Sequence, residues 1–224
     1  MLLSPKELAE QYPYTWEYLC LNRLKLEARE HGKWKHKNWY AFGRSQNLSE
    51  MEQPKILTPS IANQSSFTYD AEDYYYFVGS GGGGGGGYGI TVSHNSGLSA
   101  QYLLGLLNSK LLNVYIKENS TSFRGGYMAF NRQYIEALPI RRIDPNNRPD
   151  KAIHDRIASL VERMLTLHQQ KNTAATVHER TLLERQITAT DRQIDQLVYA
   201  LYGLTDEEVA LVEGECKIIK KQST

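Results

Sequence analysis

Residues 181–203 read TLLERQITATDRQIDQLVYALYG, and this stretch decides how the C-terminal part of the 224-residue chain folds. Its apolar residues recur alternately four and three positions apart, with one polar member, which is typical of a helix that buries a stripe against another helix. The glycine that closes the stretch favours a helix end there. The stripe consists of Leu183, Ile187, Thr190, Ile194, Leu197 and Leu201.

The segment before this stretch has the same spacing and predicts the partner helix. Its apolar stripe consists of Ile153, Ile157, Leu160, Met164 and Leu167. A polar stretch over residues 169–176 separates the two helices, so we expect an antiparallel hairpin. Beyond Gly203, Thr205 and Glu208 have the spacing of a capping box and predict a short final helix over residues 209–213, followed by a basic tail.

Residues 33–140 have a different pattern, in which short aromatic and β-branched runs alternate with turn residues. They predict strands at 39–42, 55–58, 67–69, 74–78 and 89–92, and one helix over 99–117. An N-terminal helix is expected over 4–31, interrupted at Tyr12 and Pro13. The predicted fold class is α+β: a β-rich domain with interspersed helices over residues 1–148, then an antiparallel helical hairpin over 149–224.

The charge of the chain is balanced overall but unevenly distributed. The 26 Lys and Arg against 25 Asp and Glu exclude a uniformly basic binder, and a hydrophobic content of 41% argues against disorder. Residues 21–44 hold seven basic and two acidic residues, and residues 110–142 hold six and two, whereas residues 151–224 hold ten and eleven. A face that binds nucleic acid is therefore expected in the β-rich part, and the hairpin suits a spacer or docking element.

Cysteine and histidine usage predicts neither a disulfide framework nor a zinc site, because the two cysteines and six histidines are scattered. The sequence also shows no membrane span and no signal peptide. We therefore expect a cytoplasmic protein.

Two motifs resemble sites of chemistry only superficially. The glycine run at 81–87 lacks the Lys and the Ser or Thr of a phosphate-binding loop, so it favours a turn, or a close approach to a nucleic-acid backbone. Glu215 and Lys217 have the spacing of some metal-dependent nucleases, but they follow the final helix instead of lying on paired strands. We expect no catalytic residue, cofactor or metal in this chain.

Two other segments have the composition of nucleic-acid contacts. Residues 33–40, KWKHKNWY, alternate bases with aromatic rings, which can neutralise phosphates and stack on bases, or can form a strand edge with both tryptophans in the core. Residues 120–127, STSFRGGY, place one arginine between small polar residues and glycines. Arginine is the commonest reader of guanine, but an ordinary surface loop explains this composition as well.

Several phrases, taken in order, resemble the TaqI-like C-terminal specificity domain, the target-recognition domain of type II restriction–modification enzymes and adenine-N6 DNA methyltransferases. The resemblance covers roughly residues 12–215. The phrases are WYAFGRSQN (39–47), PKILTP (54–59), YFVGS (76–80), LGLLNSK (104–110), FRGGY (123–127), LPI (138–140) and IDQLVYALYGLT (194–205).

This resemblance implies a module that reads a short sequence of double-stranded DNA and presents it to a methyltransferase, and in some enzymes to a nuclease, in cis or in trans. In such enzymes a separate domain binds S-adenosylmethionine and carries an Asn/Asp-Pro-Pro-Tyr/Phe motif, which is absent here. The chain therefore resembles a non-catalytic specificity portion without its own cofactor. Two alternatives remain open: a free-standing specificity subunit as in type I systems, and a protein-interaction scaffold built on the helices.

Carried over by position, the resemblance implies ten DNA-binding residues. Basic residues are expected near phosphates, at Lys33, Lys35, Lys37 and Arg44. Short polar side chains are expected at base edges, at Asn63, Gln64, Ser65 and Ser66. Ser122 and Arg124 form a second recognition segment.

Overall fold

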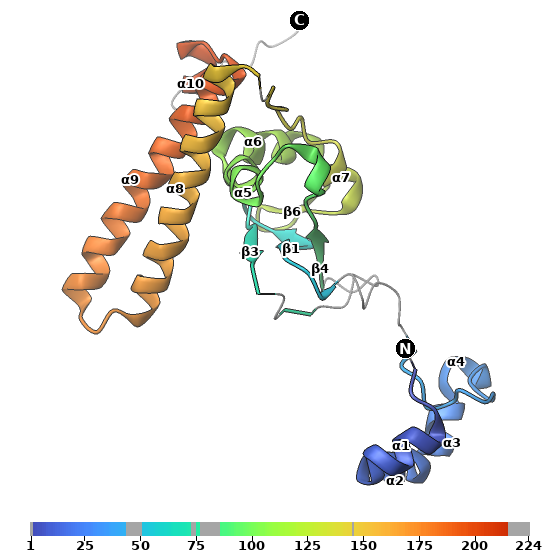
Figure 1. Cartoon of the computed structure of the whole chain (residues 1–224). Helices are drawn as coiled ribbons and strands as arrows, with labels where there is room; N and C mark the ends of the chain where they lie inside the picture. Colours follow the sequence, from blue (N-terminus) through green and yellow to red (C-terminus); the bar gives the residue numbers. More distant parts are fainter. Residues whose placement is uncertain (1, 44–50, 73–74, 77–85, 145, 215–224) are drawn as a thin grey trace, which may run out of the picture. The chain divides into compact units, whose positions relative to one another are not determined.

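A computed structural model describes residues 2–43, 51–72, 75–76, 86–144 and 146–214 of the chain. It divides into two compact units, unit 1 (residues 1–48) and unit 2 (residues 49–224) (Figure 1). The predicted boundary between the two domains, at residue 148, lies inside unit 2, at the first residue of a helix. A separation of two domains at that position stays a prediction.

Unit 1 begins with four short helices, α1 (Pro5–Gln11), α2 (Pro13–Leu21), α3 (Arg23–Glu27) and α4 (Arg29–Gly32). The expected interruption at Tyr12 is confirmed, because proline begins α2 there. The strand predicted at 39–42 is wrong. Those residues form turns, and the buried Trp39 packs against Trp16, with ring centroids 5.7 Å apart. The aromatic residues at 39–42 therefore have the composition of a strand, but Trp39 contributes to a small core instead.

The described residues of unit 2 form two antiparallel three-stranded sheets. In the first sheet, β1 (Lys55–Pro59) lies between β3 (Thr68–Asp70) and β4 (Gly87–Ile90). In the second, β6 (Tyr127–Ala129) lies between β2 (Ile61–Ala62) and β5 (Ser122–Phe123).

The strands predicted at 55–58 and 67–69 are confirmed, and the one at 89–92 begins two residues earlier, as β4. Residues 75–76 form no strand, and the rest of the strand predicted at 74–78 lies outside the described residues. The last residue of the glycine run, Gly87, shows close approach of two backbones, because a Cβ there would lie 2.4 Å from the Thr58 carbonyl oxygen. Residues 81–85 of the run also lie outside the described residues.

The single helix predicted over 99–117 is two helices, α5 (Ala100–Asn108) and α6 (Lys110–Asn119). Ser109 between them adopts an extended conformation, and its hydroxyl accepts a hydrogen bond from Leu112 N–H at 3.3 Å. The break was missed because the apolar stripe continues across it, whereas a serine cap can begin a new helix inside such a stripe. A short helix α7 (Arg132–Glu136) follows the second sheet.

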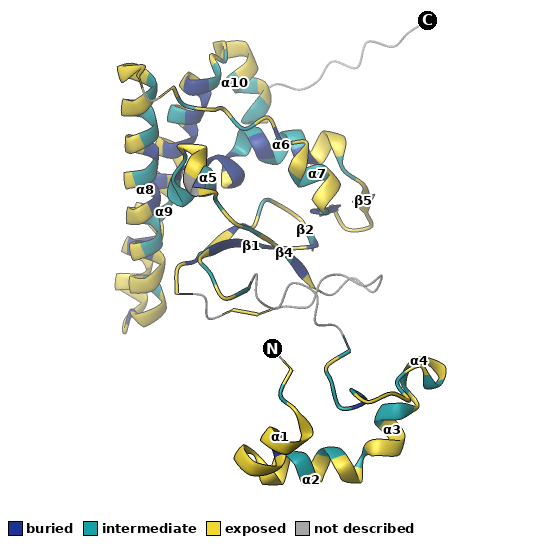
Figure 2. Ribbon diagram, turned by 45° about the vertical axis from the view of Figure 1, so that its right-hand side comes forward, coloured by how far each residue is buried: buried dark blue, intermediate teal, exposed yellow. Residues whose placement is uncertain are grey.

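The predicted hairpin is confirmed as α8 (Arg148–Thr173) and α9 (Val177–Tyr202), which pack side by side (Figure 1). Thr176 caps the start of α9, and Gly203, in the left-handed region at φ +68°, ends it. The last helix, α10 (Asp206–Val212), has the predicted capping box but begins three residues earlier than expected. The buried stripes of α8 and α9 face each other and α5, and their outer faces are exposed (Figure 2).

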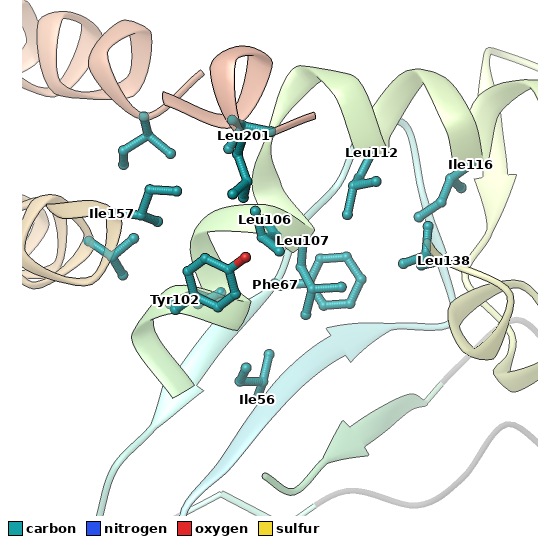
Figure 3. Packing of buried hydrophobic residues seen from close by; sticks show 14 of the residues in the cluster. Ile56, Phe67, Tyr102, Leu106, Leu107, Leu112, Ile116, Leu138, Ile157 and Leu201 are labelled. Carbon is teal, nitrogen blue, oxygen red and sulfur yellow. The ribbon is translucent and has the colours of Figure 1, made fainter. Parts of the chain in front are cut away.

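The core of unit 2 joins the sheets to the hairpin through α5 (Figure 3). Ile56 of β1, Leu106 of α5 and Ile157 of α8 are all completely buried in this cluster. Gly105 allows α5 and α8 to approach closely, since a Cβ there would lie 2.7 Å from Ile157 Cγ2 and 3.0 Å from Val161 Cγ2. The hairpin and the strands therefore share one continuous hydrophobic core.

A buried ion pair fixes the first sheet. Lys55 Nζ lies 2.6 Å from Asp70 Oδ2, and the two side chains are only 1% and 2% exposed. Lys55 Nζ also donates to the Met51 carbonyl at 2.7 Å, and Asp70 Oδ2 accepts from Tyr75 N–H at 3.1 Å. Because desolvated charges are costly without partners, this network holds the chain before β1 and after β3 against the strand pair.

Removing the lysine charge should therefore destabilise unit 2. We expect Lys55→Met to lower the free energy of unfolding by about 3 kcal/mol, because the Asp70 carboxylate would stay buried without its charged partner. Denaturant unfolding followed by circular dichroism measures this loss. The control is Lys151→Met, which removes an exposed pair with Asp155 and should change stability by less than about 0.5 kcal/mol. Equal effects of the two substitutions would contradict this assignment.

A second polar cluster joins α9 to α6 and to the residue after α10. Asp195 on α9 is 2% exposed, and its Oδ1 accepts a hydrogen bond from Lys110 N–H, at the start of α6, at 2.9 Å. Lys110 Nζ in turn pairs with Glu213, which also accepts a hydrogen bond from the Tyr199 hydroxyl at 2.8 Å. Asp195 Oδ2 has no hydrogen-bond partner among the described residues. Burial raises the pKa of the Asp195 carboxyl to about 6, although the Lys110 N–H bond opposes the shift.

This raised pKa gives stability a defined pH dependence. The native state keeps the Asp195 proton to a higher pH than the unfolded chain, so this group makes the protein less stable as pH rises from about 4 to about 6. Asp195→Asn cannot ionise and keeps an oxygen for Lys110 N–H. We expect the stability of this variant relative to wild type to increase between pH 4 and pH 7, measured by chemical denaturation at each pH. A difference that does not change with pH would refute the raised pKa.

Candidate nucleic-acid interface

The register of the second sheet brings the two predicted recognition segments together. Ala62 of β2 pairs with Met128 of β6, and Met128 pairs with Ser122 of β5. One residue further along, β5 and β6 pair Phe123 with Tyr127, and continuation of the same register places Asn63 next to Tyr127. The loop at 63–66 and the turn at 124–126 therefore leave the sheet at the same end.

Strand alternation decides which side chains at this end face solvent. Ala62 and Met128 are buried and point into the core of unit 2. Tyr127, the neighbour of Met128 in β6, must point to the other face, together with its partner Phe123, and Asn63 follows β2 at the same end of the sheet. Asn63, Phe123 and Tyr127 are all exposed. We call Asn63, Tyr127, Phe123 and the adjoining Arg124 the sheet-end strip.

The turn of the β5–β6 hairpin is built for a tight reversal that leaves Arg124 exposed. Gly125 and Gly126 have φ values of +89° and +80°, which residues with a Cβ rarely adopt. Ser122 and Arg124 are both exposed, and Arg124 makes no ion pair with the described residues. The guanidinium is thus available for a ligand.

The loop at 63–66 is held in place by two asparagines from the helices. Asn113 Oδ1 on α6 accepts from Ser65 N–H at 2.7 Å. Asn108 at the end of α5 makes two bonds to Phe67: its Oδ1 accepts from the N–H and its Nδ2 donates to the carbonyl, each at 2.9 Å. Asn63, Gln64 and Ser66 remain exposed, while Ser65 is partly buried. The loop thus presents three of its four predicted polar residues from a braced backbone.

The predicted phosphate contacts lie in the other unit. Lys33, Lys35 and Lys37 are exposed on unit 1, and Arg44 lies outside the described residues. The tryptophans between the lysines are engaged within unit 1. Arg29 lies over the half-buried Trp34, 4.1 Å from the ring centroid, and Trp39 is buried. Trp39 therefore lies in a core, as one of the two alternatives for residues 33–40 expected, and does not stack on bases. Lys33, Lys35 and Lys37 remain exposed and can contact a ligand.

Four residues of this region were not predicted from the sequence to have a role in it: Phe123, Tyr127, Asn108 and Asn113. The sequence FRGGY could have indicated Phe123 and Tyr127, because aromatic residues on both sides of a two-glycine turn are typical of a hairpin with an aromatic cross-strand pair. The bracing asparagines carry no local signal, since each contacts residues more than forty positions away.

Within the described ranges, no group of three or more His, Cys, Asp or Glu side chains is arranged to hold a metal ion. Glu215 and Lys217, the nuclease-like pair, lie outside those ranges. No described helix is both long and apolar enough to cross a membrane.

Comparison with known proteins assigns the chain to a family. Residues 9–140 match the TaqI-like C-terminal specificity domain, a match that includes both the loop at 63–66 and the β5–β6 hairpin. The chain belongs to this family. The resemblance to this family that the sequence phrases indicate is confirmed.

Individual relatives agree with this assignment. The chain is 29% identical over 214 residues to the type II restriction enzyme and methyltransferase RM.Eco57I of Escherichia coli, a match that covers 92% of this chain and 21% of that protein. It is 28% identical to the type II methyltransferase M.BanIII of Aneurinibacillus aneurinilyticus, over 61% of this chain and 23% of that protein. It is 26% identical to the type II methyltransferase M.HindII of Haemophilus influenzae, over 57% and 24%. The chain thus spans about a fifth to a quarter of the length of these relatives.

The bracing of the loop at 63–66 can be tested directly. We expect Asn113→Ala to increase hydrogen exchange at the Ser65 amide about tenfold, because this N–H would lose its buried acceptor. Exchange followed by NMR measures the effect. Asn119→Ala is the matched control on the same helix, since Asn119 bonds only to the carbonyl of Tyr115 within α6. Unchanged exchange at Ser65 in the Asn113 variant would rule out the brace.

Proposed function

We propose that this chain recognises a specific sequence of double-stranded DNA on behalf of an adenine-N6 methyltransferase, and takes no part in the methyl-transfer chemistry itself. The observation that carries the proposal is that the loop with Asn63 and Gln64 and the turn with Arg124 leave one sheet at the same end, in a chain that belongs to a specificity-domain family. Short amides, hydroxyls and a guanidinium are the groups that discriminate base edges.

The chemistry of the strip supports a duplex as the ligand. A two-stranded ribbon fits the major groove, where each base pair presents a distinct pattern of donors and acceptors. Arg124 can donate to guanine, and Asn63 and Gln64 can bond to adenine. The exposed Lys33, Lys35 and Lys37 supply the cations that neutralise phosphates.

We propose that the hairpin of α8 and α9 supports the recognition end and docks other domains, and does not contact DNA itself. Helices α8 and α9 are charge-balanced and share the core of unit 2, so they form a rigid support for the recognition end. We propose that their exposed outer faces dock the catalytic part of the enzyme, in cis or in trans. S-adenosylmethionine would bind to that catalytic part and not to this chain. A nuclease, where one is present, would dock in the same way.

Binding to duplex DNA should depend steeply on salt. We expect affinity to fall strongly between about 50 and 200 mM salt, because bound lysines release counterions from phosphates. The double variant Lys35→Glu and Lys37→Glu should bind about tenfold more weakly and lower the slope of log affinity against log salt by about two. Fluorescence anisotropy of a labelled duplex measures both quantities.

The matched control is the double variant Lys151→Glu and Lys171→Glu, which reverses two charges on the hairpin. It should leave affinity and slope close to those of the wild type. Binding that does not change with salt would contradict the proposal. Equal losses in the two double variants would instead favour a scaffold whose helices do the binding.

A further inference from the structure

The sheet-end strip contains two aromatic rings whose exposure the hairpin itself does not require. Phe123 and Tyr127 face each other across β5 and β6 and are 45% and 46% exposed. A cross-strand aromatic pair can stabilise a hairpin, which accounts for two aromatic residues at these partnered positions. It does not explain why both side chains are left nearly half exposed to solvent.

The adjoining row of the same sheet face is covered only in part. Ala129, two residues after Tyr127, is 1% exposed. Thr121, two residues before Phe123, is exposed, and its hydroxyl shares a hydrogen bond of 2.7 Å with the hydroxyl of Tyr134 on α7. Phe123 and Tyr127 therefore continue an open part of this face that leads to Arg124.

The shape of this open row favours one kind of contact with DNA. Each residue is more than half covered, and the turn lies against Tyr127, because a Cβ on Gly125 would lie 3.5 Å from its ring. This partial cover favours contact along the edges of the bases over insertion between base steps, which needs a freely protruding side chain. The two residues form an apolar patch at the end of the sheet, near Asn63 and Arg124.

A stacked duplex offers one apolar group at a base edge that matches such a patch, the 5-methyl of thymine in the major groove. Arg124 and Asn63 on either side can bond to an adjoining guanine and adenine. We propose that Phe123 and Tyr127 are specificity-determining residues that pack on thymine methyl groups in the recognised sequence. This inference rests on the proposed function and names which feature of the duplex the strip reads.

The test removes the methyl group and changes nothing else in the duplex. The full chain first selects its best site from a random duplex library, and each thymine of that site is then replaced in turn by deoxyuridine. Wild-type affinity should fall about fourfold for at least one replacement, which is the effect of one buried methyl group. Phe123→Thr and Tyr127→Thr keep β-forming residues in the hairpin, and at least one of them should abolish that sensitivity.

Two controls separate contact from folding. Tyr127→Phe keeps the ring and should keep the fourfold effect. Tyr75→Thr removes a tyrosine that is 66% exposed elsewhere in unit 2, and it should keep the effect as well. The wild-type measurement with deoxyuridine needs no variant, so a misfolded hairpin cannot conceal the answer.

Three results would overturn this inference while duplex recognition stands: a selected site without thymine, equal wild-type affinity for thymine and deoxyuridine at every position, or a fourfold effect that persists in both threonine variants. Failure of the wild-type chain to bind any duplex would overturn the proposed function, and this inference with it.

Discussion

The close packing of α5 against α8 is the constraint on which the rest of unit 2 depends. Gly105 has no side chain, so Ile157 and Val161 of the hairpin can lie directly on the α5 backbone. This contact fixes the end of α5, where Asn108 holds the backbone of Phe67 at both its N–H and its carbonyl. The hairpin therefore positions the loop at 63–66, although the hairpin itself lies outside the family match over residues 9–140.

These contacts, from the hairpin through α5 to Phe67, explain why polar side chains can be exposed at the end of the second sheet while the backbone of the loop stays ordered. The loop at 63–66 carries few apolar groups of its own, and its backbone is held instead by Asn108 and Asn113. The β5–β6 turn depends on two glycines with positive φ and on the pairing of Phe123 with Tyr127. Rigid backbone supports leave the side chains of Asn63, Gln64 and Arg124 for a ligand.

Much of this fold follows from local sequence patterns, and the rest depends on distant contacts. The spacing around Ile157 and Ile194 predicts the hairpin because the period of a helix is a local property. The break at Ser109 was missed because the apolar stripe runs through it. The strand predicted at 39–42 was wrong because Trp39 has the composition of a strand but packs in a small aromatic core. The predicted recognition segments meet only through the register of β2, β6 and β5, which the sequence does not reveal.

Whether the end of the second sheet reads duplex DNA can be measured by the change in backbone amide resonances of the full chain when its selected duplex is added. We expect the largest changes at residues 63–66 and 122–127, with small changes along the outer faces of α8 and α9. Changes concentrated on α8 and α9, with residues 63–66 and 122–127 unaffected, would contradict this expectation.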